Sequence, residues 1–176
     1  MKTTIVYLLK GKAKKFNEKL IKEVGEKFNE RFMIENEFPS HITLKFHFET
    51  NDIRKIENFV KGFCKVHKKE KIKIKGFSNF KGFVTFLKPE FSKKALKLQK
   101  DLIENLKSLR IKPCKFDKNF KPHATITFSK TNKNFNKICR YLKTLEEPSF
   151  NLNLDNIAIF KRPRKKWKLH KEFKLK

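Results

Sequence analysis

The sequence is poor in cysteine, in acidic residues and in long hydrophobic runs. Its three cysteines, Cys64, Cys114 and Cys139, are widely spaced. We therefore expect neither a disulfide framework nor a cysteine-rich zinc site, and we predict a reducing, cytoplasmic location. The first apolar run, residues 5–9, is too short for a signal peptide or a membrane span. Association with a membrane is not expected.

Acidic residues number 18 against 45 Lys and Arg, which gives a formal net charge of +27. AT-rich coding is a competing explanation, because it enriches Lys and Phe together, and Phe numbers 20. The same bias also permits Glu, however, and acids are scarce. We therefore infer a basic surface that binds a polyanion. Nucleic acid fits better than a membrane, because no amphipathic segment pairs a basic face with a tryptophan-rich one.

Apolar periodicity predicts one α+β domain over residues 1–176, built from a repeated order of elements. Each half is predicted to run strand, helix, strand, helix, strand. In the first half these elements cover residues 3–9, 14–29, 41–48, 51–66 and 71–75. In the second half they cover residues 83–87, 92–109 (with Ser92 as the helix cap), 123–129, 133–145 and 151–160, before a last strand at 166–175.

The repeat predicts a bilobal duplicated fold. Its lobes are expected to be built approximately from residues 1–80 and 81–176, and the sequence leaves open whether strands are exchanged between them. Two antiparallel-rich sheets are expected to face a central groove, with the helices on the outside. The protein is expected to act as a monomer.

Two short stretches of the sequence share a pattern. Residues 39–46 read PSHITLKF, and residues 121–128 read KPHATITF. Since side chains alternate between the faces of a strand, His41 and Thr43 are expected to share one face, with apolar neighbours on the other. The same holds for His123 and Thr125. Threonine is common in strands, but both motifs occupy the same place in the repeated order, which favours function over chance.

Two histidines that face one phosphodiester can perform acid–base catalysis, because an imidazole with a pKa of about 6.5 both accepts and donates protons near neutral pH. The hydroxyls of Thr43 and Thr125 are expected to donate hydrogen bonds to the phosphate. Lys45, predicted on the face of Thr43, would add positive charge. No Asp or Glu stands at ligand spacing beside either histidine, so neither a metal nor a cofactor is expected. The substrate must then be a reactive diester, such as a cyclic 2′,3′-phosphate or one with a neighbouring hydroxyl.

The sequence resembles the 2H phosphoesterase superfamily, in particular its 2′-5′ RNA ligase and RNA 2′,3′-cyclic phosphodiesterase group. The resemblance lies in HITLKF at 41–46, GFSNFKGFVTFL at 76–87 and FKPHATITF at 120–128. It implies an active site in a groove between two lobes, where His41 and His123 are catalytic and Thr43 and Thr125 bind phosphate. It also implies metal-independent hydrolysis of a cyclic phosphate to a 2′-phosphomonoester, with RNA ends such as those of tRNA halves as substrates.

The second motif departs from the pattern of this group. Many relatives have a small residue and then Arg after it, where this chain has Thr127 and Ser129, and Lys130 is a candidate partial substitute. Two alternatives to the cyclic phosphodiesterase stay open. One is a 2′-5′ RNA ligase, or a phosphodiesterase for another 2′-linked or cyclic nucleotide. The other is a basic RNA-binding module without catalysis.

The roles of several other residues stay open at this stage. The sequence does not decide which histidine is the base, although His123 as base and His41 as acid is the preferred assignment. Tyr7 is a candidate for stacking on a nucleotide base, with core packing as the alternative. His47 is expected at the rim of the groove and Trp167 in edge-strand packing. Lysine clusters at 68–75 and 161–168 are candidates for an RNA track.

Overall fold

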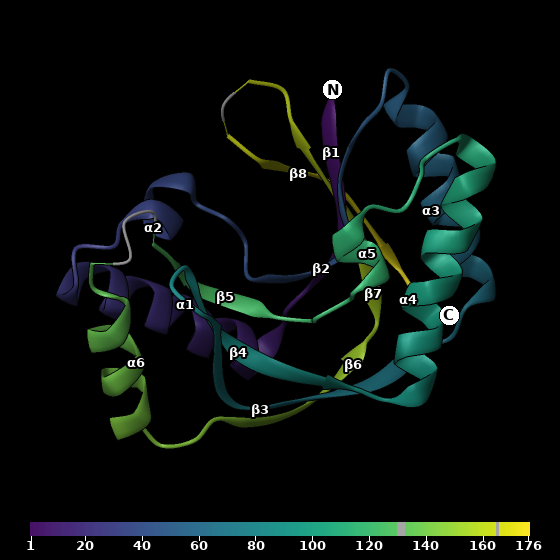
Figure 1. The fold of residues 1–176 in the computed structure, drawn as a ribbon. Coiled ribbons are helices and arrows are strands. Elements are labelled where there is room, and N and C mark those ends of the chain that lie inside the picture. Colours follow the sequence, from purple (N-terminus) through teal and green to yellow (C-terminus); the bar gives the residue numbers. More distant parts are fainter. Residues whose placement is uncertain (130–132, 165) are drawn as a thin grey trace.

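Two four-stranded antiparallel sheets form the framework of the protein in a computed structural model that describes residues 1–129, 133–164 and 166–176 (Figure 1). The first sheet has the spatial order β2 (His41–Glu49), β1 (Lys2–Leu8), β7 (Asn156–Arg162) and β8 (Lys168–Lys174). The second has the order β5 (Ala124–Phe128), β4 (Val84–Phe91), β3 (Glu70–Phe80) and β6 (Ser149–Leu154). The predicted α+β class with two antiparallel sheets is confirmed.

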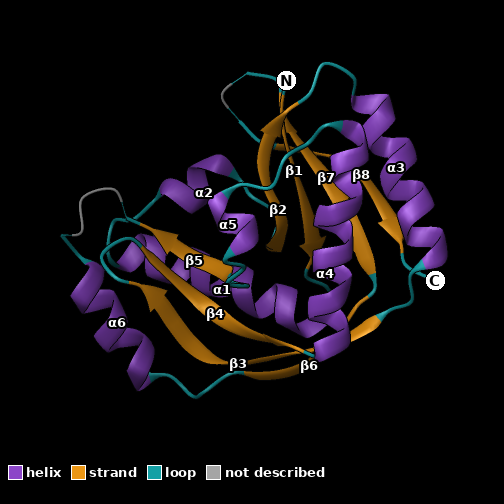
Figure 2. Cartoon of the chain, turned by 45° about the vertical axis from the view of Figure 1, so that its right-hand side comes forward, coloured by secondary structure: helices purple, strands orange, loops and turns teal. Residues whose placement is uncertain are grey.

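Four longer helices pack on the sheets: α1 (Gly11–Lys27), α3 (Ile53–Val66), α4 (Lys93–Leu106) and α6 (Phe135–Thr144). Figure 2 shows α3 next to the first sheet and α6 beside the second, while α4 contacts β2 of the first sheet and β3 and β4 of the second. The side chain of Ser92 accepts a hydrogen bond from the Ala95 amide at the start of α4, as the sequence predicts. None of the helices in the described residues is long and apolar enough to cross a membrane.

Three short helical segments lie in the connections: α2 (Phe32–Asn36), η1 (Lys107–Leu109) and α5 (Lys115–Lys118). The sequence analysis did not predict α2 or α5, because segments of one turn show no helical periodicity. Of these, α5 contacts β2, while α2 contacts α1 and β5. Both connections therefore lie close to the strands that carry the histidine motifs.

The repeated element order is present as β1–α1–β2–α3–β3 followed by β4–α4–β5–α6–β6. The sheets nevertheless do not divide the chain at residue 80. Strand β3 belongs to the first half of the sequence but lies between β4 and β6, while β7 and β8 complete the sheet of β1 and β2. Each sheet therefore contains strands from both halves of the chain.

The prediction of a single strand over residues 151–160 is wrong. The segment forms two strands, β6 and β7, which belong to different sheets and meet at Asp155. The buried Asn156 side chain explains the break. Its Oδ1 accepts a hydrogen bond from the Leu8 amide at 3.0 Å, and its Nδ2 donates to the Leu8 carbonyl at 3.1 Å, so it satisfies the backbone at the end of β1.

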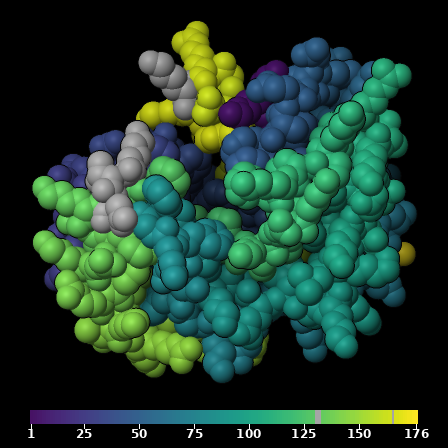
Figure 3. All heavy atoms as spheres, in the orientation of Figure 1, coloured from purple at the N-terminus to yellow at the C-terminus, as the bar shows by residue number. Residues whose placement is uncertain are grey.

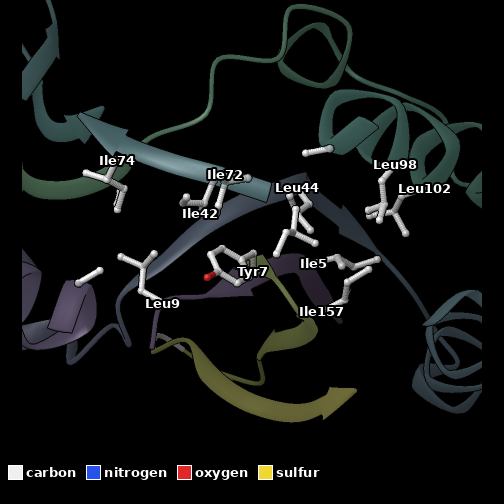
Figure 4. Packing of buried hydrophobic residues seen from close by; sticks show 14 of the residues in the cluster. Ile5, Tyr7, Leu9, Ile42, Leu44, Ile72, Ile74, Leu98, Leu102 and Ile157 are labelled. Carbon is white, nitrogen blue, oxygen red and sulfur yellow. The ribbon is translucent and has the colours of Figure 1, made fainter. Parts of the chain in front are cut away.

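A continuous hydrophobic core joins the two sheets and the longer helices (Figure 4). This core contains Ile5 and Tyr7 of β1, Leu9 directly after β1, and Ile42 and Leu44 of β2. The intervening residues of β1 point to the opposite face of the first sheet. There they form a smaller apolar cluster, which consists of Val6, Leu8, Ala158 and Phe160 with Trp167 packed against it.

Candidate active site

The two histidine motifs lie at the start of equivalent edge strands. His41 is the first residue of β2, and His123 directly precedes β5. Each strand is at the edge of its sheet, and the two strands contact one another. His41 and Thr125 line the same small cavity, so the fold brings the two motifs together. Figure 3 shows this side of the molecule hollowed between the yellow segment after β7 and the teal and green segments below it.

Both histidine rings are oriented by the same kind of hydrogen bond. Nδ1 of His41 lies 2.7 Å from the carbonyl oxygen of Pro39, and Nδ1 of His123 lies 2.8 Å from that of Lys121. A carbonyl only accepts hydrogen bonds, so Nδ1 must carry the proton in both rings. In the neutral state this leaves the lone pair on Nε2 in each ring. Both histidines are thus held in the tautomer that can accept a proton at Nε2.

Aromatic rings pack around each of these histidines. Phe160 contacts His41 edge-to-face at 5.2 Å between ring centroids. Phe80 contacts His123 in the same manner at 5.0 Å, and Phe86 lies 5.5 Å from it. This apolar packing fixes the ring planes and withdraws the rings from water.

Burial makes both imidazoles harder to protonate. Burial is the main cause that lowers the pKa of His41 to about 4. The hydrogen bond to the Pro39 carbonyl opposes this shift, and the charge of His123 adds to it. Burial also lowers the pKa of His123, and the Lys121 carbonyl opposes the shift. Both histidines are therefore neutral at neutral pH in the free protein. An anion that entered between them would raise both pKa values.

Thr43 and Thr125 occupy equivalent positions two residues after the histidines, and both are half-buried. Within the described residues neither hydroxyl makes a hydrogen bond to the protein. Thr43 pairs across the sheet with Val6, and Thr125 pairs with Phe86. Their hydroxyls are thus available to an anionic ligand beside the histidines.

A break in register comes after each motif. The pairing shifts between Thr43 and Lys45 in β2, and between Thr125 and Thr127 in β5. Such a bulge adds a residue to one strand and interrupts the alternation of side chains. Thr127, expected on the polar face of His123, is instead buried and lies 2.8 Å from the Thr85 hydroxyl. Ser129 is also buried.

The sequence predicts that Lys45 adds positive charge at the site, but its side chain does not reach the site. It is only 1% exposed, and its ammonium lies 2.6 Å from Oδ2 of Asp117 in α5. A lysine enclosed in this way cannot contact a substrate phosphate. Sequence reasoning missed Asp117, although it is the sole acid in the basic segment 110–121 and could have been noticed for that reason.

Tyr7 is also not a substrate contact in this structure. Its side chain is 1% exposed and packs in the main core with Ile42 and Leu44, on the face of the first sheet opposite to that of Val6 and Leu8 (Figure 4). The core-packing alternative therefore holds. Lys130, the third candidate contact, lies outside the described residues.

The remaining histidines have different surroundings. His67 ends α3, where its ring stacks on Phe63 at 3.7 Å, and His170 pairs with Glu57 at 2.6 Å. His47 stacks on Phe46 at 3.7 Å and faces Trp167 at 5.7 Å. In the described residues no group of three His, Cys, Asp or Glu side chains gathers at metal-ligand distance.

The fold and the paired motifs define a class of protein, a duplicated α+β phosphoesterase with one His-x-Thr motif in each half. The family comparison agrees with this class. The sequence matches the 2′-5′ RNA ligase superfamily over residues 18–166, a range that includes both motifs, and the chain belongs to this family of 2H phosphoesterases. A search of curated protein sequences gives no match.

Solved structures of low sequence identity share the fold. TT0787 of Thermus thermophilus is 15% identical, with a TM-score of 0.62 and coverage of 99% of this chain and 98% of that one. A structure described as a phosphoesterase is 13% identical, with a TM-score of 0.61 and coverage of 99% and 97%. LigT of E. coli complexed with 3′-AMP is 13% identical, with a TM-score of 0.60 and coverage of 99% and 97%. The similarity extends over nearly the whole chain in each case.

Proposed function

We propose that the protein is a metal-independent RNA 2′,3′-cyclic phosphodiesterase that uses His41 and His123 as an acid–base pair. The observation that carries this proposal is the shared hydrogen bond from Nδ1 of each histidine to the carbonyl two residues before it. A histidine with a purely structural role would not require a second histidine with the same hydrogen bond on the equivalent strand of the other sheet. The match supports two rings that both present Nε2 to one substrate.

The proposed reaction opens the cyclic phosphate in line. One neutral imidazole removes a proton from water, and the water oxygen attacks the phosphorus. The bond from phosphorus to the 3′ oxygen breaks, and the second imidazole, protonated, gives its proton to that oxygen. The product is a 2′-phosphomonoester. Thr43 and Thr125 donate hydrogen bonds to the non-bridging oxygens, where negative charge increases in the transition state.

The pKa values bear on which histidine plays which role. The acid must hold a proton when the substrate is bound, and the base must not. Because the pKa of His41 falls to about 4, His41 is the ring that is harder to protonate. This favours His41 as base and His123 as acid, which reverses the assignment preferred from the sequence.

RNA is the proposed substrate for two reasons. The chain belongs to the 2′-5′ RNA ligase superfamily, and LigT, which shares its fold, has been solved with 3′-AMP. A net charge of +27 also attracts a polyanion, and this attraction raises both the affinity and the association rate. RNA ends that carry a 2′,3′-cyclic phosphate, such as those of tRNA halves, have both the reactive diester and the polyanionic chain.

The test is hydrolysis of the four nucleoside 2′,3′-cyclic phosphates, and of a short RNA with a cyclic-phosphate end, in the presence of EDTA. We expect turnover to the 2′-phosphate, resolved from the 3′ isomer by chromatography. The variants His41→Ala and His123→Ala should each lose at least about 100-fold in kcat, since acid–base catalysis contributes about 10²- to 10⁴-fold.

His67→Ala is the matched control, because it also removes a histidine that bonds to a backbone carbonyl (Phe63) but lies at the end of α3. It should retain the wild-type rate. Retention of activity in both His41→Ala and His123→Ala would sink the assignment. Joining of RNA ends without hydrolysis would favour the 2′-5′ ligase, and RNA binding without either reaction would favour a binding module.

A further inference from the structure

A row of four aromatic rings crosses the first sheet and α5, and the proposed reaction does not use it. Phe116 of α5 packs against Phe46 in a tilted arrangement at 4.5 Å between centroids, Phe46 stacks on His47 at 3.7 Å, and His47 faces Trp167 at 5.7 Å. We call these four rings the aromatic row. They come from three separate segments of the chain, which only the fold brings together.

The break in the regularity of β2 makes the row possible. Neighbouring residues in a regular strand point to opposite faces, so the rings of Phe46 and His47 would not meet. The register of β2 against β1 is shifted on both sides of Lys45, and residues 46 and 47 therefore depart from simple alternation. Their rings stack with 30° between the ring planes. A bulge of this kind commonly re-aims side chains beside an active site.

The row lies on the sheet face that carries His41. Trp167 packs against the small apolar cluster that includes Phe160, and Phe160 contacts the His41 ring. This apolar cluster thus lies between His41 and the Trp167 end of the aromatic row. A ligand bound at His41 would have this surface beside it.

The row is accessible and is surrounded by positive charge. Phe116 is 54% exposed, while Phe46, His47 and Trp167 are half-buried, which is the exposure expected of rings that hold one another in place. The guanidinium of Arg162 lies 5.8 Å from the Trp167 ring, and the Lys115 ammonium lies 5.6 Å from Phe116. Further exposed cations are Arg164 and Lys166, between β7 and β8, and Lys168 at the start of β8.

Stacked rings flanked by cations are the chemistry that binds a single-stranded nucleic acid, since bases stack on aromatic faces while cations contact the phosphates. We propose that the aromatic row stacks successive unpaired bases of the RNA strand whose end is bound at His41. This inference rests on the proposed function and adds a substrate class to it. The substrate is then an oligonucleotide with an unpaired end rather than a mononucleotide.

Trp167 makes the proposal testable without catalysis, because it is the protein's single tryptophan. The probe is pentaadenylate with a 3′-hydroxyl end, which carries no cyclic phosphate, titrated into the full chain. We expect the tryptophan fluorescence to change on binding. Phe116→Ala should weaken the binding about 5- to 150-fold, the range found for loss of one base-stacking ring, and Phe116→Tyr should preserve it.

Phe83→Ala is the matched control. Phe83 is also 54% exposed but lies in the turn between β3 and β4, and in the described residues no ring contact joins it to the row. It should bind pentaadenylate as the wild type does. A pentamer of abasic nucleotides, which keeps the phosphates, should bind weakly. Equal binding of the abasic and adenine pentamers would overturn the proposal, because charge alone would then explain the affinity.

Kinetics separate this inference from the function on which it rests. If cyclic-phosphate ends are hydrolysed, Phe116→Ala should raise KM for a pentamer with a cyclic end and leave the nucleoside 2′,3′-cyclic phosphate reaction unchanged. Equal effects on both substrates would overturn the stacking role while the proposed function stands. If no cyclic phosphate is turned over but the Phe116 variants change pentaadenylate binding as expected, the proposed function fails and the stacking surface is supported.

Discussion

The ammonium of Lys45 lies 2.6 Å from Oδ2 of Asp117, and both side chains are 1% exposed. The same carboxylate accepts hydrogen bonds from the amides of Phe46 and Cys114 at 2.8 and 2.7 Å. The carboxylate therefore joins α5 to β2 at Phe46, which is one of the four rings of the aromatic row. Since α5 also carries Phe116, this ion pair positions the most exposed ring of the row.

Removal of one partner of this buried pair should destabilise the protein strongly. Asp117→Ala leaves the ammonium of Lys45 enclosed without a counter-charge, and we expect it to lower the free energy of unfolding by about 3–5 kcal/mol. The measurement is urea denaturation followed by circular dichroism. A double variant, Lys45→Met with Asp117→Leu, should recover part of the loss, because it removes the unpaired charge.

The control for this prediction is a second ion pair with the same N–O distance. Lys97 and Asp101 are 2.6 Å apart on α4, but their side chains are 74% and 31% exposed. Asp101→Ala should therefore change the unfolding free energy by less than about 1 kcal/mol. Equal losses in Asp117→Ala and Asp101→Ala would contradict the role given to burial.

The sequence predicts the α+β class, the repeated element order and the pairing of the two motifs, because these depend on periodicity and on residue spacing. It does not predict the strand irregularity after each motif threonine. Strict alternation places Lys45 and Thr127 on the faces of His41 and His123, but a bulge intervenes in both strands. Bulges arise from the packing of a strand against its neighbours, and a single sequence carries little signal for them.

Contacts between distant segments are the other part that sequence reasoning missed. Strict alternation in the strand predicted at 151–160 puts Asn156 on the same face as Leu154 and Ala158. Only the hydrogen bonds of Asn156 to Leu8, across 148 residues, show why the segment divides into two strands. The sequence predicts edge-strand packing for Trp167 but does not indicate its contact with His47, which lies far away in the chain. The histidines of the motifs were found because their neighbours in sequence carry the pattern.

The bulge in β5 gives the two neighbouring threonines different roles. Thr125→Val should reduce kcat/KM about 10²- to 10³-fold, since it removes a hydrogen bond to the phosphate. Thr127→Val should leave kcat/KM within about 3-fold of the wild type. It should instead lower the unfolding free energy by about 1–3 kcal/mol, because the buried Thr85 hydroxyl loses its partner. Steady-state kinetics and urea denaturation of both variants distinguish these effects. A large loss of activity in Thr127→Val would place that residue in the site.

The activity should show a bell-shaped dependence on pH with its maximum below pH 6.5. One imidazole must be neutral and the other protonated, and burial lowers both pKa values from their ordinary value, that of His41 to about 4. The two apparent pKa values belong to the pair. The maximum for kcat should lie at higher pH than that for kcat/KM, because the bound phosphate anion raises both values. Initial rates between pH 4 and pH 9 test this, and a rate independent of pH across that range would rule out the acid–base pair.

His47 should make the protein less stable in mild acid. Burial, with the charges of Lys2 and Arg162, lowers its pKa to about 4, against 6.5 when unfolded. Between these values the unfolded chain binds more protons, so stability falls as the pH drops from 6.5 towards 4. Because the ring makes no hydrogen bond within the described residues, His47→Phe removes this penalty and keeps a ring in the aromatic row. The unfolding free energy of the variant, measured with urea at pH 7 and at pH 4, should fall by about 1–3 kcal/mol less than that of the wild type. Equal decreases in the two proteins would show that His47 is not held neutral by the fold.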